Sequence, residues 1–269
     1  MGARCDVMLA AGLWRDGRCE RMVQLSVPGT AARRSLVESL HDATPAERAS
    51  ALVAAAVGEL GSLAPPTPGE LGELCVGDRD RILLALRREL AGEQLECVCP
   101  CACGETLVIG LSIDALLDAV ADEPLPLERE TGGLRVRAAT GADLEHVASR
   151  AIDGGAEAVR ELLARCILEP ADAGVEALEQ ASELLEQLDP AAEILLRGAC
   201  PACGGEVVAL LDPGAYLWTE LERWHTRLEL EIHVLASRYH WSESEIVALA
   251  PARRSRYLEL LEADPVAVR

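Results

Sequence analysis

The sequence predicts an α+β fold that is predominantly helical, with two copies of a strand–helix–helix–cysteine knuckle–strand unit and a C-terminal helical tail. Three observations predict it. The chain is rich in Ala, Leu, Glu and Arg, which favour helix. Cysteine pairs followed by glycine occur once in each half, each ahead of a short apolar run. After residue 213, apolar residues recur at intervals of three and four, the period of an amphipathic helix.

The length and composition of the chain indicate a folded protein, and its charge argues against some classes of partner. The 269 residues suffice for a sizeable core, and an apolar content of 50% argues against a disordered chain. The formal net charge of −20 makes binding to nucleic acid or to an anionic membrane surface improbable, because both need a basic surface. A basic protein partner stays compatible with this charge.

The N-terminal sequence predicts no signal peptide, because Asp6 interrupts it and no adequate apolar run follows. No segment approaches the length of a membrane span. We therefore expect a cytoplasmic protein with reduced thiols. In that compartment, the ten cysteines indicate a metal site or buried packing before disulfides.

We expect four regions along the chain. Residues 1–20 form an N-terminal segment, and residues 21–125 a first repeat with a cysteine knuckle. Residues 126–213 form a second repeat with a CPACG knuckle, and residues 214–269 a C-terminal helical region. The stretch 121–133, with two prolines and a glycine pair, is the predicted linker between the repeats.

The two repeats match in pattern. Each opens with alternating apolar residues that predict a half-buried strand: Val23, Leu25 and Val27 in one, Leu134, Val136 and Ala138 in the other. Apolar helix patterns follow at 52–57 and 162–167. Residues 103–117 then align with 203–217 without a gap. The alternative is chance resemblance between Ala- and Leu-rich helices, and the knuckle-to-strand match is the stronger evidence against it.

Three further sequence patterns predict helices. Asp78 is a candidate N-cap for a helix whose apolar stripe is Ile82, Leu83, Leu86 and Leu90. The stripe of the long C-terminal helix is Leu217, Leu221, Trp224, Leu228, Ile232 and Leu235. Ser242 with Glu245 predicts a capping box, and Pro251 suits the first turn of a last helix.

The CPACG sequence is typical of a zinc knuckle, in which two thiolates two residues apart face one ion. Cys200 and Cys203 are its predicted ligands. The first knuckle, CPCACG, has one residue more. Aligning its ends with the second predicts Cys99 and Cys103 as ligands, with Cys101 as the alternative to Cys99.

Two knuckles facing each other would give four sulfurs to one structural Zn²⁺, about one per chain, in a closed and therefore non-catalytic site. A thiol switch, a disulfide, or inert buried thiols are the alternatives. A thioredoxin-like motif is disfavoured because Gly-Gly and a strand, instead of a helix, follow Cys203. The sequence carries no nucleotide-binding or hydrolase motif, so no catalytic residue is predicted and the protein is expected not to be an enzyme.

Several motifs together resemble the baseplate hub assembly chaperone family of contractile phage tails and phage-tail-like contractile injection systems. They are VGDRDRILLALRREL, the following CxCG, TGADLE, CPACG, and the C-terminal LEIHVLASRYHWSESEIVALAPARRSRYLELLE. The resemblance runs from Leu74 to Glu262, although the first knuckle departs from the plain CPxCG of the family. It implies a non-enzymatic assembly chaperone or structural component of the baseplate, with hub or spike proteins as partners. The alternative is a cytosolic zinc- or redox-responsive regulatory protein.

The C-terminal region supplies the candidate partner-binding residues Trp241, Arg253, Arg254 and Arg256. Arginine pairs well with carboxylates, so the three arginines are expected to dock an acidic patch of a hub partner or to neutralise glutamates of the chain's own long helix. Trp241 belongs to a group of three aromatic residues that either form an interface hot spot or close a small satellite core.

Overall fold

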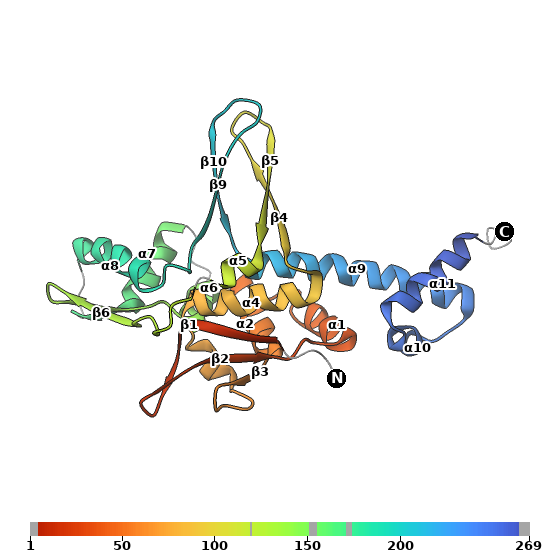
Figure 1. Cartoon of the computed structure of the whole chain (residues 1–269), viewed down its shortest axis with the longest axis horizontal. Helices are drawn as coiled ribbons and strands as arrows, with labels where there is room; N and C mark the ends of the chain where they lie inside the picture. The colour runs from red at the N-terminus through yellow and green to blue at the C-terminus, as the bar shows by residue number, and fades with distance from the viewer. Residues whose placement is uncertain (1–4, 119, 151–154, 171–173, 264–269) are drawn as a thin grey trace. The chain divides into compact units, whose positions relative to one another are not determined.

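A computed structural model describes residues 5–118, 120–150, 155–170 and 174–263 (Figure 1). Helices hold 51% of the described residues and strands 25%, so the fold mixes α and β with helix as the larger part. The chain divides into two compact units. The first takes Met1–Val27 and Asp42–Leu217, and the second takes Pro28–His41 and Trp218–Arg269. None of the described helices has the length and apolar character that a membrane crossing needs.

The first unit begins with an antiparallel sheet in the order β1-β2-β3. Its strands are β1 (Cys5–Arg15), β2 (Arg18–Leu25) and β3 (Val57–Leu60). β2 contains Val23 and Leu25 of the strand predicted from alternation, and both are buried. The strand ends before the third predicted residue, Val27, which is exposed. β1 was not predicted, although its alternate residues Val7, Leu9, Ala11 and Leu13 form part of the core.

A second antiparallel sheet has the order β6-β7-β8, with β6 (Glu128–Thr131), β7 (Leu134–Arg137) and β8 (Ile167–Glu169). β6 lies inside the stretch predicted as a linker. The reason is the Gly132-Gly133 pair, whose φ angles of 61° and 83° form a tight two-residue turn between Thr131 and Leu134. Part of the predicted linker is therefore a hairpin.

Seven helices of the first unit are described. They are α2 (Pro45–Ala56), α3 (Pro68–Gly72), α4 (Val76–Ala91), α5 (Ile113–Leu117), α6 (Gly141–Ser149), α7 (Gly155–Cys166) and α8 (Val175–Leu188). α4 is the central one, because every residue from Val76 to Arg87 is buried. A helix buried on all sides must satisfy its charged side chains inside the protein.

Asp78 shows how α4 does this. The helix begins at Val76 with Cys75 at the N-cap, so Asp78 is not the N-cap but lies in the first turn. Its carboxylate accepts hydrogen bonds from the backbone amides of Ala10, Ala11 and Gly12, at 2.5, 3.0 and 2.7 Å. These amides lie where β1 shifts register against β2 and lose their strand partners. Asp78 therefore anchors β1 to α4.

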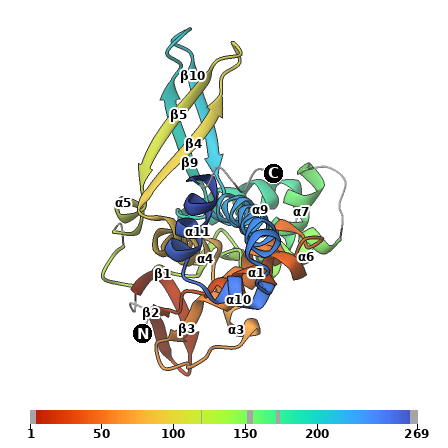
Figure 2. The same ribbon diagram turned by 90° about the vertical axis from the view of Figure 1, so that its right-hand side faces the viewer.

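Two separate β-hairpins complete the first unit. One pairs β4 (Gln94–Pro100) with β5 (Thr106–Ser112), and the other pairs β9 (Ile194–Ala199) with β10 (Glu206–Leu211). They lie side by side in both views (Figures 1 and 2). One core cluster contains buried side chains of both, among them Leu95, Cys97, Cys99, Leu196, Cys200, Val207 and Leu211.

The second unit contains α1 (Thr30–Ser39), most of α9 (Pro213–Tyr239), α10 (Glu243–Ala248) and α11 (Pro251–Ala263). Ser242 and Glu245 form the predicted capping box, and Pro251 is the first residue of α11 as predicted. The guanidinium of Arg33 on α1 lies 4.4 Å from the ring centroid of Trp224 on α9. This cation–π contact joins the two helices.

Candidate metal centre

The loops that close the two hairpins bring four thiols together: those of Cys101, Cys103, Cys200 and Cys203. All four sulfur atoms lie within 4.8 Å of one another. The Sγ atoms of Cys101 and Cys203 are 3.7 Å apart, and those of Cys103 and Cys200 are 3.6 Å apart. Each close pair joins one hairpin to the other.

These distances fit a tetrahedral metal ion. With metal–sulfur bonds of about 2.3 Å, the edges of the tetrahedron measure about 3.8 Å. A disulfide would need a sulfur–sulfur distance of about 2.05 Å, and all four cysteines are free. Among the described residues, these four cysteines form the one group of three or more His, Cys, Asp or Glu side chains that could hold a metal ion.

Glycines shape both turns. Gly104 and Gly204, which follow the knuckles, have φ angles of 90° and 70°, a backbone conformation that favours glycine. The amide of Gly104 donates to the carbonyl of Cys101, and that of Gly204 to the carbonyl of Cys200, each at 2.9 Å. The amide of Gly205 also lies 3.4 Å from the sulfur of Cys203. An N–H group that points at a sulfur atom, as that of Gly205 does, stabilises negative charge on it.

The two knuckles differ in length by one residue. The amide of Cys101 donates to the carbonyl of Glu105, as the amide of Cys200 donates to that of Gly205, both at 2.8 Å. Cys101 therefore takes the position of Cys200. The first knuckle is C-x-C-G and is one residue shorter than the C-x-x-C-G of the second.

The structure thus brings together Cys103, Cys200, Cys203 and the alternative ligand Cys101, and it does not bring Cys99 to the group. Cys99 lies within β4, is buried, and has its sulfur 3.8 Å from the carbonyl oxygen of Cys97. Side chains of a strand alternate between its faces, so Leu95, Cys97 and Cys99 all face the hairpin core. The alternation of cysteines was the signal that could have placed Cys99 in the core.

The thiols cannot share negative charge easily without a cation. Hydrogen bonds from the backbone amides of Cys203 and Ala202 lower the pKa of Cys200 to about 7. The backbone of Cys103 lowers the pKa of Cys101, but hydrogen bonds among the neighbouring thiols outweigh this and raise it to about 12. Cys200 therefore loses its proton readily, whereas the neighbouring Cys101 keeps its proton. A divalent cation would remove this conflict and bind all four as thiolates.

The predicted partner-binding residues lie in the second unit. Trp241 stacks on Tyr239 with 4.7 Å between ring centroids and meets Tyr257 edge-on at 4.8 Å. Arg254 is buried, and its Nε lies 2.9 Å from a carboxylate oxygen of Glu231 on α9. Arg254 thus binds a glutamate of the chain's own long helix, one of the two predicted roles.

Arg253 and Arg256 are exposed. A guanidinium nitrogen of Arg253 lies 3.3 Å from the hydroxyl of Tyr257, and Arg256 pairs with Glu259 at 2.9 Å on the same helix. Exposed pairs of this kind contribute little to folding, so both side chains can reach another molecule.

Comparisons with protein-family models, with curated proteins and with solved structures find no match to the chain. What the centre can do is therefore argued from its own geometry. Four sulfur atoms would fill all positions of a tetrahedral metal ion and would leave no open position for a substrate or a reactive water.

Proposed function

We propose that the protein is a non-enzymatic assembly chaperone or structural component of the baseplate hub of a contractile phage tail or phage-tail-like injection system. It would act in the cytoplasm with hub or spike proteins as partners. The resemblance of residues 74–262 to the hub chaperone family supports this role. Its most distinctive helix, α4, is the buried centre of the first unit, so these motif residues have a folding role.

The closed group of four sulfur atoms is the observation that supports a non-enzymatic role. We propose that it holds one structural Zn²⁺. The sulfur–sulfur distances of 3.6 and 3.7 Å agree with a tetrahedral zinc site, and all-cysteine sites are typical of structural zinc. The ion would lock the tips of the two hairpins together.

We also propose that the chain contains an internal duplication, which would explain why two knuckles share one ion. Each half has a three-stranded antiparallel sheet with strands in sequence order. Two helices, α3 and α4, follow this sheet in the first half, and one, α8, follows it in the second. In each half the chain then forms a hairpin with a cysteine knuckle at its turn and another helix. Two equivalent hairpins are the parts from which a pseudo-symmetric metal site can form.

Deleting the gene tests the assembly role. We expect contractile particles to be absent or defective, and the chain to co-purify with a hub or spike protein during assembly. Complementation with the wild-type gene should restore the particles, which controls for effects on neighbouring genes. Particles of normal yield, length and contraction in the deletion strain would contradict the proposal.

One observation favours the alternative, a zinc- or redox-responsive regulator. Cys103 and Cys203 are exposed, so oxidants and chelators can reach the cluster. Thiol titration separates the two roles. A structural site predicts four thiols that react only after a chelator removes the metal. A regulator predicts that these thiols react, or form disulfides, in the untreated protein.

A further inference from the structure

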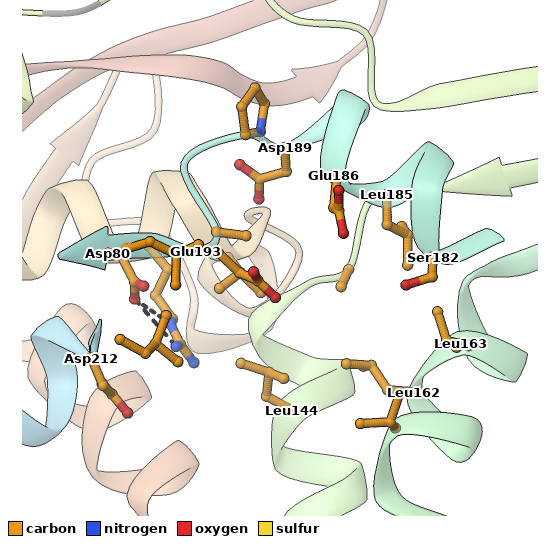
Figure 3. A pocket seen from close by; sticks show the side chains of 18 of the residues that line it. Asp80, Leu144, Leu162, Leu163, Ser182, Leu185, Glu186, Asp189, Glu193 and Asp212 are labelled. Carbon is orange, nitrogen blue, oxygen red and sulfur yellow. Dashed lines mark hydrogen bonds and ion pairs between the residues drawn. The ribbon is translucent and has the colours of Figure 1, made fainter. Parts of the chain in front are cut away.

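A cavity of about 580 Å³ lies in the first unit between the start of α4, helices α6, α7 and α8, and the β9–β10 hairpin (Figure 3). Its volume is in the roughly 300–1,000 Å³ range of ligand pockets. Its wall is apolar on the helical side, with Leu144, Leu162, Leu163 and Leu185. Leu210 of the hairpin also lines it and is 60% exposed, so apolar surface continues from the cavity to the outside.

The polar part of the lining is acidic. Glu186, Glu193 and Asp212 are exposed carboxylates, and Asp80 and Asp189 lie deeper. Within the part of the chain that the structure describes, Glu186 and Glu193 have no ion-pair partner. Among the described residues that line the cavity, Arg79 is the one basic side chain beside these five carboxyl groups. The complementary ligand is therefore positively charged as well as apolar.

Arg79 provides a second, independent sign of a ligand. Its side chain is 8% exposed, and its Nε and Nη2 donate to Asp80 at 3.3 and 3.2 Å (Figure 3). Its Nη1 is buried and has no hydrogen-bond partner among the described residues. A buried donor without an acceptor costs free energy, which a ligand that supplies an oxygen would recover.

We propose that this cavity binds a basic amphipathic segment of a partner protein. Its apolar side chains would pack among the leucines, and its arginine or lysine side chains would meet Glu186, Glu193 and Asp212. A main-chain carbonyl oxygen in the last turn of the segment, where a helix leaves its carbonyls without an internal partner, would accept the hydrogen bond of Arg79 Nη1. Apolar grooves that take one face of an amphipathic helix are a common mode of peptide recognition. The proposal rests on the cavity alone and holds for either candidate function.

Fluorescence anisotropy with a labelled peptide tests it. The probe has Leu and Arg at helical spacing, and a scrambled peptide of the same composition controls for attraction to a protein of charge −20. We expect saturable binding of the first peptide and much weaker binding of the second. Reversing the rim with Glu186→Arg and Glu193→Arg should weaken binding by about tenfold or more.

Matched variants separate the cavity from general charge. Glu179→Arg with Glu183→Arg changes the net charge equally, on exposed residues of α8 that do not line the cavity, and should leave most of the affinity. Leu210→Gln should weaken binding, whereas Val208→Gln, at an exposed residue of the same strand outside the cavity, should not. Absence of saturable binding, equal binding of the scrambled peptide, or equal loss in the matched variants would overturn the proposal.

Discussion

The sulfur atoms of Cys103 and Cys200 lie 3.6 Å apart, although 97 residues separate the two cysteines in the sequence. Cys103 closes the β4–β5 hairpin, and Cys200 begins the turn of the β9–β10 hairpin. An ion bound by both would join two hairpins that have no strand pairing with each other. The free energy of metal binding would then add to the stability of their packing.

The first prediction concerns the ligands. We expect about one zinc ion per purified chain. Cys101→Ser and Cys200→Ser should lose most of the metal, because each removes a sulfur of the group. Cys99→Ser should keep it, because Cys99 faces the hairpin core. Elemental analysis of the proteins after dialysis measures the zinc content.

The pair Cys99→Ser and Cys101→Ser is the sharp comparison, because both cysteines belong to the same short segment. Full occupancy in Cys101→Ser together with loss in Cys99→Ser would assign the fourth ligand to Cys99. A content near two zinc ions per chain, or full occupancy in Cys200→Ser, would contradict a single shared site.

The second prediction concerns the contact between the hairpins. Gly198 faces the other hairpin, and a Cβ atom there would lie 2.5 Å from Cδ2 of Leu107. We expect Gly198→Val to destabilise the fold by about 1 kcal/mol relative to Gly110→Val, because the flexible Leu107 side chain must move to make room for the added methyl groups. Gly110→Val is the control, since a Cβ at Gly110 meets nothing within 4 Å. Thermal unfolding of the metal-bound proteins should separate the two, and equal melting temperatures would argue against close packing of the hairpins.

Local patterns predicted much of the centre and of the mixed fold. A cysteine–glycine knuckle and a strand are encoded by adjacent residues, so Cys103, Cys200 and Cys203 and the strands beside them were found from the sequence. The capping box of Ser242 was found for the same reason. To choose between Cys99 and Cys101, one must know the residue at which β4 ends. A cysteine inside the strand faces the hairpin core, whereas a cysteine just beyond its end lies in the turn beside the other thiols.

Features that depend on distant residues were not predictable in this way. Asp78 looked like an N-cap because helix starts favour aspartate, but its partners are amides of β1 some 66 to 68 residues away. The cavity is equally non-local, since it joins residues from Val76 to Asp212. Its acidic residues did not stand out in a chain with 45 carboxylates.

The third prediction concerns pH. Burial raises the pKa of Asp80 from its ordinary 3.8 to about 7, although the charge of Arg79 opposes this. The folded state therefore holds a proton that the unfolded state has lost, so this residue lowers stability as pH rises from about 4 to about 7. Relative to the wild type, Asp80→Asn should gain stability over this range, by at most about 1.4 kcal/mol per pH unit. Urea unfolding at about pH 5 and about pH 7 measures it.

Asp143→Asn is the matched control. Burial raises the pKa of Asp143, but hydrogen bonds from Arg137 and Thr140 outweigh it and lower the pKa to about 2. The stability that this carboxylate contributes is present above its ordinary pKa and is lost only as pH falls toward about 2. Its difference from the wild type should stay constant between about pH 5 and about pH 7. A constant difference for Asp80→Asn as well would contradict the raised pKa.

The fourth prediction separates two arginines of α11. The Arg254 side chain is 3% exposed, and it binds Glu231 at 2.9 Å and the carbonyl oxygen of Leu249 at 2.7 Å. Arg254→Ala leaves Glu231, itself 13% exposed, with the more exposed Arg227 as its remaining partner. We expect a loss of about 1–3 kcal/mol, because Glu231 and the carbonyl oxygen of Leu249 each lose a buried hydrogen-bond donor. Arg256→Ala breaks only an exposed pair with Glu259 and should cost about 0–0.5 kcal/mol.

Hydrogen exchange of α11 and chemical unfolding measure these costs, and co-purification with the hub or spike protein that we propose as partner measures binding. If Arg256 docks an acidic patch, Arg256→Glu should lose the partner while the unfolding curve stays unchanged. Arg254→Ala should also lose it, but together with protection of α11, because it disrupts the surface that presents Arg256. If the Arg256→Glu variant still co-purifies with the partner, Arg256 does not belong to the interface. Arg256 contributes too little to folding for a change in stability to hide a loss of binding.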